Sequence, residues 1–170
     1  MQENHQKEQY FFAEDTLKRL ATVAHQHKGK PLLLCCPMVG LMYRSLYISP
    51  IVSLDSDPRF IIWRVEMWDI YRPKPLALYE PTLIICDPPF NKVKMDQLFT
   101  AIRVLTPTRP VDTVKLLIAI DPSHAGALVG TFAMYGLRPT GFRPSYVTVS
   151  DGVGIEFYSN LSDEELTPLF

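Results

Sequence analysis

The sequence predicts an α/β fold in which a mostly parallel sheet is covered by helices and ends in a C-terminal antiparallel hairpin. Two observations support this prediction. Short, almost wholly apolar runs, typical of strands buried on both faces, alternate with stretches whose apolar residues recur at helical spacing. Near the end of the chain, Asp151-Gly152 separates two β-like segments, which is typical of a hairpin turn. In such folds, ligands bind at the carboxyl ends of the parallel strands.

Length and composition limit the domain organisation. The 170 residues, 47% of them apolar, suffice for one domain and its core but not for two full domains. We therefore expect residues 1–170 to form a single domain, with the polar residues 1–9 flexible. The net charge of -1 indicates no overall basic surface, so contact with a nucleic acid needs local patches. The chain carries no membrane-length apolar run and no signal-peptide pattern, which predicts an intracellular protein, cytoplasmic or nuclear, without membrane attachment.

The sequence predicts no metal site. Cys35, Cys36 and Cys86 do not have the spacing of zinc ligands, and all three lie in apolar runs. We expect them to be free and buried, which fits a reducing compartment. The four histidines form no ligand pattern and are expected at the surface or at helix ends.

The first third of the chain begins with a helix. After three aromatic residues at 10–12, apolar residues recur at helical spacing from position 17 to 24, and Gly29 ends the pattern. Pro31 breaks the chain, and residues 32–36 form the first buried strand. A second helix is expected at 41–47 and a second strand at 51–54.

The middle of the chain contains two further strands. Residues from 60 to about 67 read as a more amphipathic third strand, followed by a proline-containing loop up to Pro81. Residues 82–86 form the fourth strand. Helical spacing then runs from 95 to 105 and is closed by the prolines at 107 and 110.

The last third completes the alternation. Residues 115–120 form a fifth apolar strand, and Asp121 or Ser123 can cap a helix that Gly136 ends. The final two strands are expected at 145–150 and 153–159, joined through Asp151-Gly152.

Acidic residues follow three of these strands. Asp55 and Asp57 come after the second, Asp69 after the third and Asp87 after the fourth. Because parallel strands end at the same edge of a sheet, we expect these carboxylates to crowd one edge.

The turn Asp87-Pro88-Pro89-Phe90 is the strongest functional motif. The amino group of an aromatic ring, such as N6 of adenine, is a poor nucleophile because its lone pair is delocalised into the ring. The Asp87 carboxylate and the Pro88 carbonyl, held about 3 Å away, would accept its hydrogens and favour a pyramidal nitrogen. The prolines make the turn rigid, and Phe90 offers a stacking face. An Asp-Pro step is also a common turn, but the order strand, acid, prolines, aromatic favours catalysis.

Four segments in order, QYFFAEDTLKRL, LLLCCPMVG, SLDSDPRF and ICDPPF, resemble the probable N6-adenine methyltransferase family. The resemblance covers about residues 9–160. It implies a Rossmann-like, class I S-adenosylmethionine-dependent methyltransferase, whose amino-methylating branch carries such a turn after strand four. That family includes a zinc-finger CCHC-type ribosomal RNA adenine-N6 methyltransferase and small lysine methyltransferases that act on elongation factor 1A.

The resemblance also implies roles for residues. The cofactor, S-adenosylmethionine, would lie across the ends of strands one to four and contact nine residues: Gln9, Tyr10, Phe11 and Phe12 along its border, Cys36 and Pro37 at its methionine part, Asp55 and Asp57 at its ribose, and Asp69 near its adenine. A carboxylate suits ribose because it can accept hydrogen bonds from both hydroxyls. One departure is that CCPMVG, with only Gly40, replaces the usual glycine-rich loop.

Three functions stay open. The first is methylation of adenine N6 in an RNA whose base stacks on Phe90 and whose phosphates contact Lys92, Lys94, Arg138 and Arg143, although these cations also fit a solvated rim. The second is protein lysine methylation, which the small single domain and the pI near 6.4 favour. The third is a non-catalytic scaffold that has lost cofactor binding, and an activating protein partner is compatible with the first two.

Overall fold

The computed structural model describes residue 3, residues 10–148 and residues 154–170. The predictions for Gln9, for the Asp151-Gly152 turn and, except at Glu3, for the flexibility of residues 1–9 therefore lie outside the described residues.

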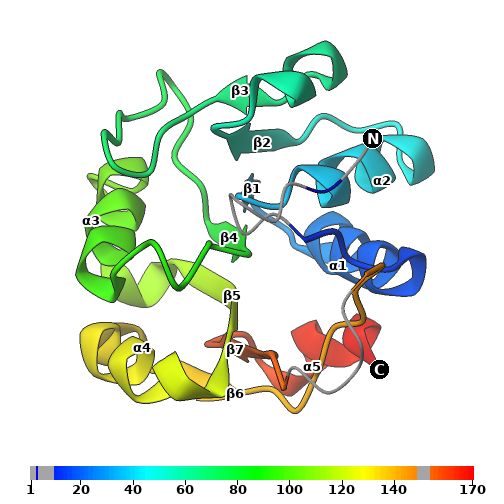
Figure 1. The fold of residues 1–170 in the computed structure, drawn as a ribbon. Coiled ribbons are helices and arrows are strands. Elements are labelled where there is room, and N and C mark those ends of the chain that lie inside the picture. Colours follow the sequence, from blue (N-terminus) through cyan, green and yellow to red (C-terminus); the bar gives the residue numbers. More distant parts are fainter. Residues whose placement is uncertain (1–2, 4–9, 149–153) are drawn as a thin grey trace.

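Within the described residues, seven strands form one sheet in the order β3-β2-β1-β4-β5-β7-β6 (Figure 1). The first five are parallel, whereas β7 runs antiparallel to both β5 and β6. This confirms the predicted α/β fold with its mostly parallel sheet and antiparallel C-terminal strands. The strands are β1 (Pro31–Leu34), β2 (Val52–Asp55), β3 (Glu66–Met67), β4 (Leu83–Cys86), β5 (Lys115–Ile120), β6 (Arg138–Pro139) and β7 (Glu156–Ser159).

Helices cover both faces of the sheet (Figure 1). One face carries α3 (Met95–Leu105) and α4 (Ala125–Thr131), and the other carries α1 (Glu14–Gln26), α2 (Pro37–Leu46) and α5 (Asp163–Leu166). Successive side chains of a strand enter opposite cores: Leu32 and Leu34 pack on the α3 face, whereas Leu33 packs on the α1 face. Burial on both faces is the reason that β1 reads as a continuous apolar run.

The predicted third strand is largely wrong. Residues Pro58–Trp63 form a 3-10 helix, and only Glu66–Met67 form β3. The Asp57 side chain caps this helix by accepting a hydrogen bond from the Arg59 amide, and Pro58 occupies the first turn, where its missing N–H costs nothing. Phe60 is buried while its neighbours Ile61 and Ile62 are exposed, so the apolar run does not lie in the sheet.

The predicted second helix begins earlier than expected. Pro37 is its first residue, which suits proline because the first helical N–H has no intrahelical partner. The predicted cap after β5 is displaced by one element: Asp121 accepts a hydrogen bond from the Ser123 amide and so caps a 3-10 turn, whereas α4 itself begins after His124, without a side-chain cap.

The predicted hairpin strand at 145–150 is also wrong over its described residues. The antiparallel neighbours of β7 are β5 and β6, and Tyr146 instead forms an isolated bridge with Phe12. Two backbone hydrogen bonds, Ala13 N to Ser145 O at 2.7 Å and Val147 N to Phe11 O at 2.9 Å, flank this bridge. Residues 145–147 therefore pair with residues 11–13. The backbone groups of residues 145 and 147 that a hairpin with β7 would need are used in this pairing.

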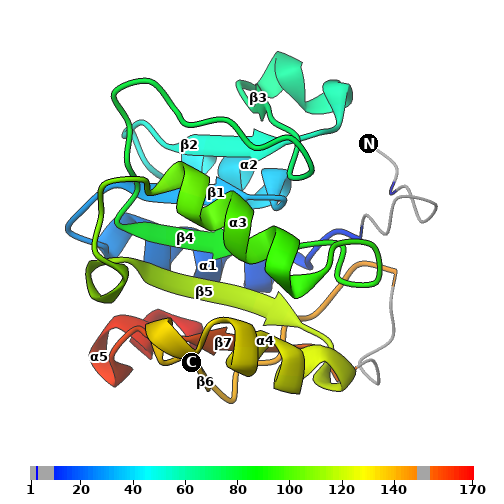
Figure 2. The same ribbon diagram turned by 90° about the vertical axis from the view of Figure 1, so that its left-hand side faces the viewer.

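The topology places a crevice at the carboxyl ends of the strands. The chain proceeds from β1 to β2 on one side, whereas β4 pairs with the other side of β1, and ligands bind at such a switch point. Figure 2 shows the arrowheads of β2 and β5 directed to the same side of the molecule. Among the described residues, no helix has the length and apolar character needed to cross a membrane.

Candidate active site

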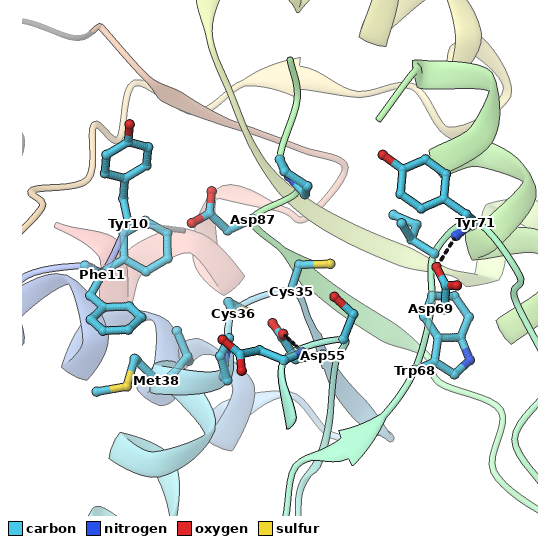
Figure 3. Close-up of a pocket in the computed structure, with 17 residues that line it drawn as sticks. Tyr10, Phe11, Cys35, Cys36, Met38, Asp55, Trp68, Asp69, Tyr71 and Asp87 are labelled. Atoms are coloured by element: carbon cyan, nitrogen blue, oxygen red, sulfur yellow. Dashed lines mark hydrogen bonds between the residues drawn. The ribbon is translucent and has the colours of Figure 1, made fainter. Parts of the chain in front are cut away.

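A cavity lies at the carboxyl ends of β1 to β4 (Figure 3). All eight described residues that were predicted to contact a cofactor line it, so the structure brings these distant segments together, whereas Gln9 lies outside the described residues. Their binding roles stay predictions. The lining consists of Tyr10, Phe11 and Phe12; Cys35, Cys36, Pro37, Met38 and Val39; Asp55, Ser56 and Asp57; Trp68, Asp69, Ile70 and Tyr71; and Asp87 and Pro89.

The two acidic residues after β2 have different surroundings. Asp55 ends the strand, and its Oδ1 accepts a hydrogen bond of 2.8 Å from the Asp57 amide (Figure 3). The Asp57 carboxylate is bound by the Arg59 side chain through both oxygens, at 2.9 Å from Nε and 2.6 Å from Nη2 to Oδ2. The ion pair with Arg59 shows that Asp57 helps to hold this loop, and contact with the cofactor stays a prediction for both carboxylates.

The loop after β1 makes its tight turn without glycine. Cys35 has a φ of 57°, in the left-handed region, at a cost of about 1 kcal/mol for a residue with a side chain. Its amide is held by the Leu54 carbonyl at 2.9 Å, and α2 begins two residues later. The substitution of CCPMVG for a glycine-rich sequence therefore leaves the turn in place. Cys35, Cys36 and Cys86 are all free, as predicted, but only Cys36 and Cys86 are buried, and Cys35 is half-buried. Burial raises the pKa of the Cys36 and Cys86 thiols.

Residues after β3 form the opposite wall of the cavity from Tyr10 and Phe11 (Figure 3). Asp69 Oδ1 accepts a hydrogen bond of 2.9 Å from the Tyr71 amide. The Tyr71 hydroxyl donates to the Lys92 carbonyl at 3.1 Å, which ties this wall to the chain that follows Asp87-Pro88-Pro89-Phe90. The sequence analysis missed Trp68, Ile70 and Tyr71, although their position beside Asp69 was a usable signal.

Asp87 is the most unusual titratable group of the cavity. Its amide extends the sheet by donating to the Leu34 carbonyl at 3.2 Å, while its carboxyl has no hydrogen-bond partner among the described residues. Figure 3 shows this carboxyl directed into the cavity. Removal from water raises the pKa of Asp87 to about 8, because no nearby cation or donor compensates the lost solvation. A half-buried carboxyl without a hydrogen-bond partner among the described residues is typical of a functional site.

The two prolines after Asp87 have different tasks. The Pro89 carbonyl accepts hydrogen bonds from the amides of Lys92 and Val93, at 2.8 and 2.9 Å, and so closes the turn. Over the described part of the chain, no hydrogen bond to the Pro88 carbonyl occurs. The turn therefore leaves one carbonyl acceptor beside the Asp87 carboxyl, as its sequence predicts.

A second, smaller cavity adjoins the turn. Its lining consists of Tyr10, Asp87, Pro88, Pro89, Phe90, Asn91, Tyr146 and Ile155. Tyr10, Asp87 and Pro89 line both cavities, so the carboxyl lies at their junction. Such an arrangement suits group transfer between one molecule in the large cavity and a second in the small one. Tyr146 and Ile155 were missed because the sequence assigned their segments to a terminal hairpin.

The four predicted phosphate-binding cations are not brought together. Lys92 and Lys94 are exposed just after the turn, and Arg143 is exposed in the segment before Tyr146. Arg138 lies in β6, and its Nη2 donates to Asp163 Oδ1 at 2.6 Å. Arg138 pairs with Ser159, the last residue of β7, and this end of β7 lies beside the amino-terminal half of β5. The placement of Arg138 at the pocket is therefore wrong, because antiparallel pairing carries it to the opposite edge of the sheet.

Two further findings concern the surroundings of the site. The ring of His124 lies 5.9 Å from the ring of Phe90, centroid to centroid, which the sequence analysis did not anticipate. In the part of the chain that the structure describes, no group of three or more histidine, cysteine, aspartate or glutamate residues is arranged to hold a metal ion.

Comparisons with known proteins identify the family and the fold of the chain. The sequence matches the family described as probable N6-adenine methyltransferase over residues 3–162. No curated protein matches the chain.

Several solved structures share the fold. They include a TehB-like SAM-dependent methyltransferase from Corynebacterium glutamicum, with a TM-score of 0.56, 13% identity and coverage of 84% of this chain and 85% of that chain. A precorrin 8w decarboxylase from Methanobacterium thermoautotrophicum has a TM-score of 0.55 and 10% identity, covering 95% of this chain and 97% of that one. The ribosomal protein L11 methylase from Lactobacillus delbrueckii subsp. bulgaricus has a TM-score of 0.52 and 10% identity, covering 92% and 78%. At these identities the similarity shows the fold.

The large cavity fits S-adenosylmethionine, the methyl donor that the family and fold imply. Asp55 would offer a carboxylate at the end of β2 to the ribose hydroxyls, beside the turn at Cys35. Asp87 supplies negative charge near the cationic donor when it is ionised. This protein belongs to the probable N6-adenine methyltransferase family and is an S-adenosylmethionine-dependent methyltransferase with a class I, Rossmann-like fold.

Proposed function

We propose that the protein methylates N6 of an adenine in RNA. The observation that carries this proposal is the Asp87 carboxyl, which lies without a hydrogen-bond partner among the described residues, next to the unused Pro88 carbonyl. Two acceptors side by side match the two hydrogens of an aromatic amino group. The family description supports an adenine as the acceptor.

The two acceptors would activate the amino group without removing its proton first. The ionised Asp87 carboxylate accepts a hydrogen bond from one amino hydrogen, and the Pro88 carbonyl accepts one from the other. These two hydrogen bonds draw the amino hydrogens out of the ring plane and localise the lone pair on the nitrogen. S-adenosylmethionine supplies the methyl group as an electrophile. Asp87 ionises more readily once a positive charge lies in the large cavity, so cofactor binding and activation of the acceptor are coupled through this carboxyl.

Aromatic side chains suit the small cavity to a planar base. Phe90 is partly buried and packs against both hydrophobic cores, so its ring has a fixed position. Tyr10 and Tyr146 also line this cavity. Stacking on an aromatic side chain contributes about 1–3 kcal/mol per base, and an unstacked base of single-stranded RNA reaches such a pocket most readily.

Protein lysine methylation is the second candidate, and one observation favours it. The pKa of Asp87 near 8 lets its carboxylate take a proton from a lysine ammonium group close to neutral pH. A lysine must lose that proton before it can be methylated, whereas the amino group of adenine is already neutral. The lysine route therefore uses Asp87 as a base, and the adenine route uses it only as a hydrogen-bond acceptor.

Transfer of an isotope-labelled methyl group tests the two candidates. The protein and labelled S-adenosylmethionine are incubated separately with total RNA and with total protein from the source cells, and with Asp87→Ala as the matched control. We expect label in RNA, recovered as N6-methyladenosine after digestion to nucleosides, and loss of that label in Asp87→Ala. Label found in protein alone, as methyllysine, would establish the second candidate instead.

A further inference from the structure

Some residues that line the small cavity have no role in the proposed activation of the amino group. This part of the lining consists of Tyr146 and Ile155, which come from the C-terminal part of the chain, whereas Asp87-Pro88-Pro89-Phe90 belong to the turn after β4. Ile155 is apolar, so Tyr146 is the polar group on this side of the cavity.

Tyr146 is held in place from two directions. The backbone hydrogen bonds on either side of it, of 2.7 and 2.9 Å, fasten its segment to residues 11–13. Its ring packs on the ring of Phe12, with centroids 4.9 Å apart and an angle of 36° between the planes. Phe12 is buried and packs in turn against Phe157 in the core. A substrate therefore meets Tyr146 in a preorganised position, which reduces the entropic cost of a contact with it.

The hydroxyl of Tyr146 is available as a hydrogen-bond donor. It makes no hydrogen bond with any described residue. Burial, together with the nearby charge of Asp87, raises the pKa of Tyr146, so the phenol keeps its proton. The small cavity thus presents acceptors, the Asp87 carboxylate and the Pro88 carbonyl, together with the Tyr146 hydroxyl as a donor, beside the polar side chains of Tyr10 and Asn91.

This combination distinguishes the two classes of acceptor. The side chain of a lysine presents donors alone, whereas adenine presents its amino group beside ring nitrogens that accept hydrogen bonds, N1 on one side and N7 on the other. Building on the proposed function, we propose that Tyr146 donates a hydrogen bond to a ring nitrogen beside the amino group that is methylated. Tyr146 then makes the small cavity specific for heteroaromatic amines that carry such a nitrogen.

Analogues that lack one ring nitrogen test this assignment. The probe is a short RNA of uridines around one central adenosine, compared with the same RNA carrying 1-deazaadenosine or 7-deazaadenosine at that position. For the wild type, we expect kcat/KM to fall about tenfold or more with one of the two analogues, because a donor built to meet a nitrogen is left unpaired. For Tyr146→Phe, we expect a similar loss with adenosine and no further loss with that analogue.

Comparison of the two ratios separates this role from a structural one. A change in the intrinsic reactivity of the analogue affects both enzymes alike and cancels. A merely structural role for the tyrosine would lower all rates and leave the ratio of adenosine to analogue unchanged, which would overturn the assignment. Tyr10→Phe removes a phenol hydroxyl from the same cavity and is the matched control, which should keep the discrimination.

The outcomes also distinguish the two levels of the proposal. If the wild type methylates both analogues as fast as adenosine, the assignment of Tyr146 is wrong while adenine methylation stands. If the wild type methylates no RNA probe and labels protein instead, the proposed function is wrong and the assignment fails with it.

Discussion

Replacement of Asp87 by asparagine should make the folding stability of the protein respond differently to pH. The carboxyl has a pKa of about 8 in the folded state against an ordinary value of 3.8. Between these values the folded protein holds a proton that the unfolded chain has released, so the contribution of Asp87 to stability is complete below about pH 4 and is lost as pH rises through 8. Asparagine keeps the shape and an acceptor oxygen but cannot ionise.

The magnitude follows from the same pKa values. At about 1.4 kcal/mol per pH unit, the rise from about pH 5 to about pH 8 would remove at most about 4 kcal/mol from the wild type and nothing from Asp87→Asn. Because the carboxyl faces a cavity open to water, which screens part of the penalty, we expect about 2 kcal/mol. Asp87→Asn should therefore be more stable than the wild type, and by more at pH 8 than at pH 5.

Urea unfolding of both proteins at the two pH values measures this difference. Other titrating groups are common to both chains and cancel in the comparison. Parallel pH dependences of the free energy of unfolding would show that Asp87 is not withdrawn from water, and the argument for its role would fail.

The rate of methyl transfer and its pH dependence should also depend on the Asp87 carboxyl. Asp87→Ala removes an acceptor from the transition state and should lower kcat about a hundredfold or more, provided methyl transfer is rate-limiting. Wild-type kcat/KM, at saturating S-adenosylmethionine, should rise with pH along a limb below 8, because the positive charge of the donor lowers the pKa of Asp87. Asp87→Asn should keep part of the activity and lose that limb. If kcat/KM of Asp87→Asn still rose with pH below 8, the rise would come from the titration of another group.

Three further predictions concern the surroundings of Asp87. Asp55→Ala should weaken binding of S-adenosylmethionine by about 1–3 kcal/mol through loss of charge-assisted hydrogen bonds, as measured by calorimetry, and unchanged affinity would place the ribose elsewhere. Phe90→Tyr should retain more activity than Phe90→Leu, since only tyrosine keeps an aromatic plane for stacking; equal kcat/KM for the two variants would contradict this. If RNA is the substrate, Lys92→Ala and Lys94→Ala should each reduce the salt dependence of RNA binding, measured by fluorescence anisotropy, whereas Arg138→Ala should not; an equal effect of all three would show that these charges act non-specifically.

The sequence by itself determined the fold class and the order of its parts. Strands buried on both faces read as continuous apolar runs, as for Leu32 to Leu34, and helices show their period, as for Met95–Leu105, because these patterns reflect burial directly. It also placed most of the large cavity, since an acidic residue after a parallel strand must lie at the carboxyl edge of the sheet. Asp55, Asp69 and Asp87 meet there for that reason.

What the sequence left open depended on contacts between distant segments. The pattern of residues 60–67 predicted a strand, but residues 60–63 belong to a 3-10 helix that Asp57 caps and Pro58 begins. The pairing of residues 11–13 with 145–147 carries no local pattern, so the place of Tyr146 in the small cavity could not be predicted. The antiparallel pairing of β6 with β7 carries Arg138 to the opposite edge of the sheet from the one predicted. The raised pKa of Asp87 likewise needs the surrounding structure, because only tertiary packing removes water from a carboxyl without giving it a partner.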